Sequence, residues 1–179
     1  MLARDDFEVR GQVLRSGQDE VPFSGSRRFA CPCRRGLRYR RCLALLRFAG
    51  DIDLVESSIT VPAMCASACE GIDFVLHQAA LPSVPRSVAD PAASHEACAT
   101  GTLNMLVAAR DAGVKRFVYA GSSSAYGDTP TLPKVESMPA LPLSPYAVAK
   151  LAGEHYCKVF SLIYGFETVV LRYFNIFGP

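Results

Sequence analysis

The sequence predicts an α/β fold in which a parallel β-sheet is wrapped by helices. Three observations predict it. From residue 51 onward, short apolar strands alternate with helical stretches, the order typical of a parallel sheet. The strands are largely continuous apolar runs, which indicates burial on both faces. The chain has 179 residues, of which half are apolar and a fifth are charged, and this is enough for one domain with a hydrophobic core.

The first strand–helix–strand unit starts directly after residue 51. We expect a strand at residues 52–59, a short helix at 62–70 and a mostly apolar strand at 72–77. Gly71 is well placed to end the helix. A loop with two prolines is expected at 81–86.

The second half continues the alternation. The expected elements are a helix at 90–112 ending at Gly113, a strand at 116–120, a long loop at 127–145 with five of the twelve prolines, a helix at 146–164 ending at Gly165, and a strand at 168–173. In such sheets, ligands bind beyond the carboxyl ends of the strands. We therefore expect the site among Gln78 to Ala80, Ser122 to Ser124, and Phe174 with Asn175.

The first fifty residues do not fit this pattern. They hold 11 Arg, no Lys and 5 acidic residues, a net charge of +6, whereas residues 51–179 carry −4. Neither the strand period nor the helix period persists in them. A nucleic-acid-binding arm is one interpretation, and a solvated or poorly ordered segment is the one we favour. We therefore expect a boundary near residue 50, an atypical segment at 1–50, and no nucleic-acid partner.

Composition also bears on the compartment. The charged start, from Met1 to Glu8, excludes a signal peptide, and no apolar run approaches the roughly 18 residues of a membrane helix. A cytoplasmic protein with no membrane partner is expected.

Seven cysteines, an odd number, then indicate reduced thiols. Cys31, Cys33 and Cys42 lack zinc-site spacing, so we expect no metal. Cys65, Cys69 and Cys98 lie in Ala-rich helical sequence and are expected to be small buried hydrophobic residues.

One pair of residues carries a chemical prediction. In Tyr146-Ala-Val-Ala-Lys150, the phenol and the ammonium are four residues apart and share one face of the predicted helix. A nearby cation favours the phenolate, so Tyr146 is a candidate general base toward a substrate hydroxyl. An exposed helix pair without function is the alternative. Ser122, just past a buried strand, supports the first interpretation because its hydroxyl could bind a reacting alcohol or carbonyl, although serine is also common in ordinary loops.

From about Asp53 to Pro179 the sequence resembles the extended short-chain dehydrogenases/reductases of the NAD-dependent epimerase/dehydratase family. The resemblance rests on His77-Gln-Ala-Ala80, Gly101-Thr-Leu-Asn104, Phe117 through the serine run to Tyr126-Gly127, Ser144-Pro-Tyr-Ala-Val-Ala-Lys150 and Leu171-Arg-Tyr-Phe-Asn-Ile-Phe-Gly-Pro179. Within the family, Ala80-Leu-Pro-Ser-Val-Pro-Arg-Ser87 is similar to the loop of the UDP-N-acetylglucosamine branch of UDP-sugar 4-epimerases.

The resemblance implies a mechanism. Tyr146 would take the proton from the 4-hydroxyl of a UDP-sugar while hydride passes from C4 to NAD, and hydride would return to the other face of the sugar. Lys150 would hold the nicotinamide ribose and lower the pKa of Tyr146. Ser122 aligns with the family's catalytic Ser or Thr, assisted by Ser123. The resemblance also implies a homodimer that pairs through the helices near 90–112 and 146–164.

The resemblance assigns two further groups of residues. The cofactor would be lined by Ser58, Ile59, Gln78, Ala79, Ala80, Leu81, Tyr146, Lys150 and Phe174. The substrate would contact Ser83, Val84, Ser122, Tyr146 and Asn175.

Within the family, the dehydratases place an Asp-Glu pair directly after the catalytic Thr. Here those positions are Ser123 and Ser124, which have no carboxylate for acid–base work. This favours an epimerase, with a dehydratase or reductase of the same family as an alternative.

The sequence also departs from the family pattern. Residues 1–50 hold no glycine-rich turn to receive the pyrophosphate, Ser58 stands where the family has an Asp that contacts adenine, and Cys98 replaces an Asn. The expected fold is therefore a partial Rossmann-like doubly wound parallel sheet, lacking the first βαβ glycine-rich unit and the C-terminal substrate domain. A fragment or damaged gene product is our hypothesis, and a catalytically inactive interaction module is the alternative function.

Overall fold

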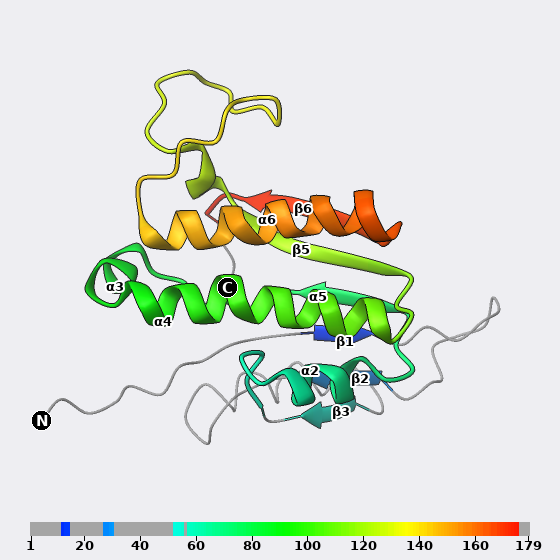
Figure 1. Cartoon of the computed structure of the whole chain (residues 1–179). Coiled ribbons are helices and arrows are strands. Elements are labelled where there is room, and N and C mark those ends of the chain that lie inside the picture. Colours follow the sequence, from blue (N-terminus) through cyan, green and yellow to red (C-terminus); the bar gives the residue numbers. More distant parts are fainter. Residues whose placement is uncertain (1–11, 15–26, 31–51, 56, 176–179) are drawn as a thin grey trace, which may run out of the picture.

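A computed structural model of the chain describes residues 12–14, 27–30, 52–55 and 57–175 (Figure 1). The largest sheet has the strand order β1-β4-β5-β6. In chain order, its strands are β1 (Gln12–Leu14), β4 (Phe74–His77), β5 (Arg116–Ser122) and β6 (Glu167–Tyr173). β4, β5 and β6 are parallel, whereas β1 pairs with β4 in the antiparallel direction. The α/β class and the parallel sheet predicted from the sequence are confirmed.

Two more strands form a sheet of their own. β2 (Arg27–Ala30) pairs in parallel with β3 (Ile52–Val55). The strand predicted at 52–59 is therefore shorter than expected. It also lies outside the sheet that β4, β5 and β6 form. The chain turns at Ser58, whose backbone oxygen accepts a hydrogen bond from Val61 N at 3.1 Å. β1 and β2 lie in the segment 1–50, most of which is outside the described residues.

Helices alternate with these strands. They are α2 (Pro62–Cys69), α3 (Val84–Ala89), α4 (Pro91–His95), a π-helical turn (Glu96–Thr100), α5 (Gly101–Asp111), a 3₁₀ turn (Ser123–Tyr126) and α6 (Pro145–Tyr164). The predicted helix at 90–112 is thus a continuous helical segment made of α4, the π-helical turn and α5. The predicted helix at 146–164 is confirmed as α6. Gly71, Gly113 and Gly165 have φ of 64°, 71° and 64°, the left-handed conformation that ends helices.

The loop predicted at 81–86 is wrong in its second half, because α3 begins at Val84. The Ser83 hydroxyl accepts a hydrogen bond from Arg86 N at 3.2 Å and so caps this helix. Pro85 indicates a loop when it is considered alone, but it is tolerated in a helix's first turn, where the N–H has no helical partner.

The described helices form one layer. The β4–β5 and β5–β6 connections cross the sheet in the same direction, and right-handed crossovers put their helices on one face. α5 contacts α2 on one side and α6 on the other, as Figure 1 shows. The second helical layer of a doubly wound sheet is not among the described residues. In the described part of the chain, no helix is long and apolar enough to cross a membrane.

The core lies between this layer and the sheet. Phe117 and Tyr119 of β5 are fully buried, as are Leu106 of α5 and Cys157 of α6. Cys65, Cys69 and Cys98 are free thiols with 2 %, 0 % and 0 % exposure, so their prediction as small buried hydrophobic residues is confirmed. Cys31, Cys33 and Cys42 lie outside the described residues.

Candidate active site

A cavity of about 980 Å³ opens at the carboxyl ends of β4, β5 and β6. Its lining residues come from the loop after β4, the end of β5 with the 3₁₀ turn, the first turns of α6 and the end of β6. The residues at these strand ends were expected to meet, because the carboxyl ends of parallel strands share one edge of a sheet.

Ten of the residues expected in the site line this cavity. They are Gln78, Ala80, Leu81, Val84, Ser122, Ser123, Tyr146, Lys150, Phe174 and Asn175. The set therefore includes the whole Ser–Tyr–Lys group, in which Ser122 comes from the end of β5 and Tyr146 and Lys150 come from α6.

Four expected residues do not line it. Ala79, in the loop after β4, is fully buried, and the Ser83 hydroxyl caps α3. Ser58 lies in the turn after β3, where its hydroxyl is 2.9 Å from that of Thr60. The backbone oxygen of Ile59 accepts hydrogen bonds from Cys65 Sγ at 3.2 Å and from Asn104 Nδ2 at 3.0 Å.

Ser122 begins the 3₁₀ turn at the end of β5. Its Oγ accepts a hydrogen bond from Ser124 N at 3.2 Å and lies 2.7 Å from Ser124 Oγ. These contacts fix the hydroxyl at the strand end, on the side where Tyr146 enters from α6. The Ser144 hydroxyl caps α6 by accepting from Ala147 N at 3.1 Å, which orients the helix start that carries Tyr146.

The environment of Tyr146 differs from the expectation. Burial raises the pKa of its phenol, and the neighbouring Ser122 hydroxyl opposes that rise. Lowering of this pKa by Lys150 was expected, but Lys150 is not among the causes of the shift. A raised pKa keeps the phenol protonated until a ligand brings further positive charge.

The Lys150 ammonium is directed elsewhere, toward Tyr119 of β5. Nζ lies 4.4 Å from the centroid of the Tyr119 ring, and the Tyr119 hydroxyl donates to the Lys150 backbone oxygen at 3.2 Å. Gly153 makes room for this, since a Cβ there would lie 2.4 Å from the Tyr119 hydroxyl oxygen. Lys150 is only 3 % exposed, and burial lowers its pKa to about 8.

His77, at the end of β4, packs against Tyr119, the residue that the Lys150 ammonium faces. Its Nε2 lies 3.0 Å from the Thr102 hydroxyl, which donates to Cys98 O at 2.7 Å. The Thr102 proton is thus used, so Nε2 of His77 is the donor in this hydrogen bond. Its ring stacks on Tyr119 with centroids 5.7 Å apart and planes 21° apart.

Burial first, and Lys150 second, lower the pKa of His77 to about 3. The unfolded chain binds this proton near pH 6.5, so stability is lost as the pH falls from 6.5 toward 3. We expect His77→Gln to remove about 1.4 kcal/mol per pH unit from the acid slope of the unfolding free energy. Urea unfolding between pH 6 and 4 measures this slope. The matched control is His155→Gln, at an exposed position of α6, and an unchanged slope in His77→Gln would contradict the assignment.

The loop after β4 is held by Cys98 from the π turn. Leu81 N donates to Cys98 Sγ at 3.4 Å, and the thiol faces Leu81 O at 3.9 Å. The Cys98 thiol therefore contacts the backbone of the cavity-lining loop at two atoms.

Sequence reasoning missed two cations of the cavity, Arg86 and Lys134. The Lys134 ammonium donates to the backbone oxygens of Thr129 and Thr131, the latter at 2.9 Å, and so closes the long loop upon itself. Lys134 is the only cation in residues 127–145, and this was the signal that could have found it.

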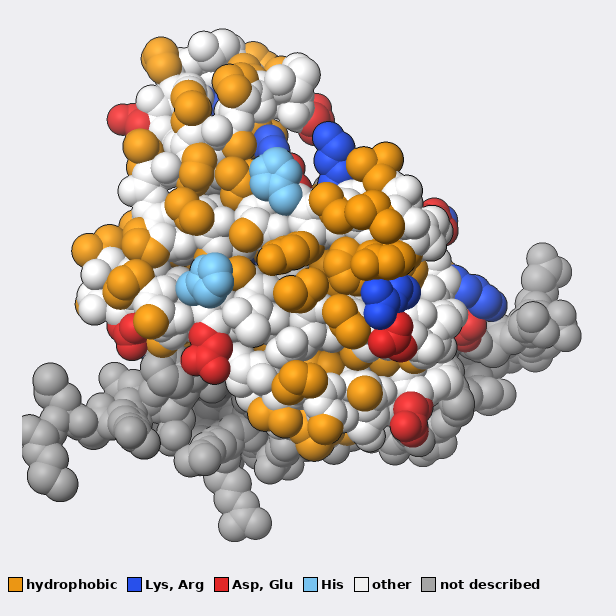
Figure 2. Space-filling view, viewed as in Figure 1, with side chains coloured by type: hydrophobic (Ala, Val, Ile, Leu, Met, Phe, Trp, Pro, Cys, Tyr) orange, Lys and Arg blue, Asp and Glu red, His pale blue; other side chains and the backbone are white. Residues whose placement is uncertain are grey.

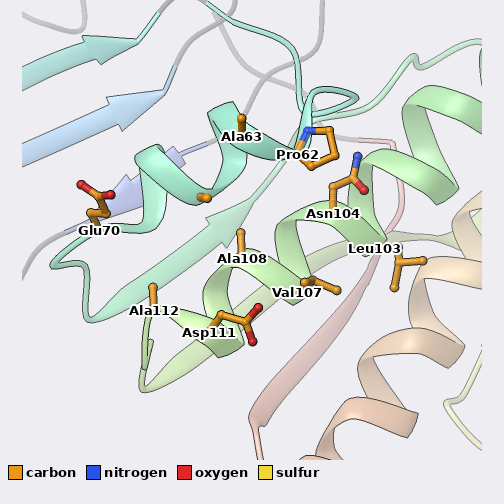
Figure 3. Close-up of a pocket in the computed structure, with 10 residues that line it drawn as sticks. Pro62, Ala63, Glu70, Leu103, Asn104, Val107, Ala108, Asp111 and Ala112 are labelled. Carbon is orange, nitrogen blue, oxygen red and sulfur yellow. The ribbon is translucent and has the colours of Figure 1, made fainter.

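A second cavity of about 620 Å³ lies between α2 and α5 (Figure 3). Ala63, Val107 and Ala108 give it an apolar wall, and the carboxylates of Glu70 and Asp111 lie toward one end. It contains none of the expected site residues. No group of His, Cys, Asp and Glu in the described residues is arranged to hold a metal ion.

The profile of the NAD dependent epimerase/dehydratase family matches residues 14–179. A putative UDP-glucose 4-epimerase from Methanocaldococcus jannaschii is 39% identical over 108 residues, which cover 60% of this chain and 35% of the relative. The chain thus spans about a third of the length of this relative.

Two solved structures share the fold. The UDP-N-acetylglucosamine 4-epimerase from Methanobrevibacter ruminantium, in complex with UDP-N-acetylmuramic acid, is similar with a TM-score of 0.70 and 36% identity, over 73% of this chain and 42% of that one. A dTDP-glucose 4,6-dehydratase from Streptomyces venezuelae with NAD bound has a TM-score of 0.74 and 31% identity, over 78% and 44%. The partial Rossmann-like fold expected from the sequence is confirmed.

Proposed function

Since the chain belongs to the NAD-dependent epimerase/dehydratase family, we propose that it forms the catalytic part of a nucleotide-sugar 4-epimerase acting on UDP-N-acetylglucosamine or UDP-glucose. The observation that carries the proposal is the single cavity that Ser122, Tyr146 and Lys150 line together.

The chemistry at this cavity derives from its side chains. Tyr146, at the first turn of α6, is the group that takes the proton from the 4-hydroxyl and later returns it. The Ser122 hydroxyl, which lines the same cavity as Tyr146, binds the same oxygen and holds it as a carbonyl forms. NAD, when bound, supplies reversible hydride acceptance at C4.

The residues that line the cavity fit the nicotinamide half of NAD. The Lys150 ammonium is buried at the cavity wall and has no carboxylate partner in the part of the chain that the structure describes. It is therefore available to hydrogen-bond the ribose hydroxyls of a bound NAD. Gln78, Ala80, Leu81 and Phe174 line the same wall and would enclose the nicotinamide half, while Val84 and Asn175 would face the sugar. Ser58 and Ile59, with Ala79 and Ser83, would act from outside this cavity.

The two residues directly after Ser122 favour a 4-epimerase over a dehydratase. Ser123 lines the cavity, and the amide and hydroxyl of Ser124 both contact the Ser122 hydroxyl. Both residues are serines, so neither position offers a carboxyl for water elimination. Because the dehydratase structure has the same fold as this chain, the fold alone does not separate the two activities, and these two residues do.

We further infer a homodimer through α5 and α6. Hydrophobic side chains gather over these helices (Figure 2), and Leu162 and Ile163 of α6 are 75 % and 68 % exposed. Isolated exposed apolar residues are ordinary, but a patch along two neighbouring helices is typical of an interface. A cytoplasmic location, with no nucleic-acid or membrane partner and no metal, completes the proposal.

The experiment measures NAD binding and sugar conversion together. The 179-residue chain and a completed form are each titrated with NAD and incubated with UDP-N-acetylglucosamine and UDP-glucose. The completed form carries a glycine-rich βαβ unit at its N-terminus and the C-terminal substrate domain of a similar UDP-glucose 4-epimerase. We expect the completed form to bind NAD saturably and to interconvert the 4-epimers. If neither form binds NAD, the chain is the inactive module, and if the completed form yields a 4-keto-6-deoxy sugar, it is a dehydratase.

A further inference from the structure

Arg172 near the end of β6 makes a two-point ion pair with Glu154 of α6. Nε donates to Glu154 Oε2 at 2.9 Å, and Nη2 donates to Oε1 at 2.6 Å. The side chains are only 15 % and 22 % exposed. A planar guanidinium bound at two points fixes the orientation of both partners, not merely their distance.

The same guanidinium contacts a third element. Its central carbon lies 4.6 Å from the centroid of the Tyr126 ring, a distance at which a cation is attracted to an aromatic face. Tyr126 closes the 3₁₀ turn that Ser122 opens, and it is 4 % exposed. Tyr126 also stacks with Phe174, with centroids 6.3 Å apart and planes 21° apart.

The position of each partner makes these contacts relevant to catalysis. Glu154 lies four residues after Lys150 and eight after Tyr146, so the three share one face of α6. On β5, Gly121 pairs with Arg172 and Ser122 pairs with Tyr173. A Cβ at Gly121 would lie 3.1 Å from Leu171 O, so the two strands approach closely beside the serine turn.

We propose that Arg172 is the positioning residue of this site, because its side chain joins the serine turn, through Tyr126, to the helix that carries Tyr146 and Lys150, through Glu154. This inference rests on the proposed function and adds a residue to it. Arg172 does not line the cavity and acts through the relative placement of Ser122 and Tyr146.

Loss of this link is expected to change the pKa of Tyr146. Ser122, which lines the same cavity, lowers the pKa of the Tyr146 phenol against the effect of burial. If the turn and the helix lose their link, the Ser122 hydroxyl moves away from the phenol and the phenol becomes a weaker acid. The result is a shift in titration that a general loss of stability would not produce.

The chain contains a matched control pair. Arg116 of β5 and Glu167 of β6 form an ion pair at the opposite end of the same two strands, 47 % and 55 % exposed. It has the same residue types and the same neighbouring strands, but it is distant from the cavity and exposed to solvent, where an ion pair contributes little.

The experiment labels the tyrosines with fluorotyrosine and monitors the ¹⁹F signal of Tyr146, assigned with Tyr146→Phe, through a pH titration. Arg172→Lys keeps the charge without the two-point fork, and Glu154→Gln keeps the shape without the charge. We expect both to raise the pKa of Tyr146 and the double variant to add little further, whereas Glu167→Gln leaves it unchanged.

In the completed, active form, both variants should lower kcat about ten- to a hundredfold with little change in KM, since a small misplacement of reacting groups has such an effect. The titration needs no sugar conversion, so it judges Arg172 even if the chain is not an epimerase. A lower melting temperature with an unmoved Tyr146 titration would make the pair merely structural and overturn the proposal. If Arg172→Lys fails to fold, the isosteric Glu154→Gln decides the question by the same criterion.

Discussion

Tyr146→Phe is expected to lower the turnover of UDP-N-acetylglucosamine by about 10²- to 10⁴-fold in the completed protein, the range typical of losing a general acid–base group. Phe keeps the ring that lines the cavity and removes only the hydroxyl that exchanges the proton. NAD binding should persist, because the ammonium of Lys150 is left in place.

Tyr156→Phe is the matched control for this experiment. Tyr156 lies on the same helix, is 37 % exposed and does not line the cavity. Turnover measured by NMR should be unchanged in this control. A Tyr146→Phe protein that keeps turnover within about twofold of the parent would contradict the catalytic assignment.

Lys150→Met is expected to stabilise the protein and to abolish its function. Lys150 carries a buried ammonium whose pKa is lowered to about 8. The charged ammonium therefore lowers the stability of the folded state wherever the lysine is protonated. Methionine has similar length and no charge. We expect a gain of about 1–3 kcal/mol in unfolding free energy at pH 7, because removing a buried charge without a carboxylate partner relieves its desolvation. The affinity for NAD should fall at least about tenfold, since a charge-assisted hydrogen bond is lost.

The pH dependence of this gain has a definite sign. Between pH 8 and 10.5 the unfolded chain still binds the lysine proton while the folded chain has released it, so the parent becomes more stable with rising pH. The advantage of Lys150→Met should therefore be largest below pH 8 and shrink across that window. Lys158→Met, at an exposed position of α6, is the control and should change little. A Lys150→Met protein that is less stable at pH 7 would mean that another group of the protein compensates the ammonium.

Much of the site was predictable because its signals are local. Ser144 and Pro145 start α6 and Gly165 ends it, and the four-residue spacing puts Tyr146 and Lys150 on one face. The strand ends could be found from apolar runs, and parallel pairing then brings Ser122, Phe174 and Asn175 together.

The rest depends on tertiary register, which a single sequence does not contain. Glu154 and Arg172 are 18 residues apart, and only the docking of α6 on β6 makes them partners. The direction of the Lys150 ammonium is set by Tyr119, 31 residues away, and by the absence of a side chain at Gly153. β3 was expected in the main sheet because its own pattern cannot say which strand it pairs with.

The proposed epimerase chemistry is tested most directly by the fate of hydrogen at C4 of the sugar. The completed protein is incubated with NAD and UDP-N-acetylglucosamine in D₂O, and the products are identified by NMR. Because hydride leaves and returns at C4 without meeting solvent, and Tyr146 exchanges only the hydroxyl proton, we predict the 4-epimer with protium retained at C4. Deuterium at C4, or a 4-keto-6-deoxy sugar as the product, would contradict the proposed mechanism.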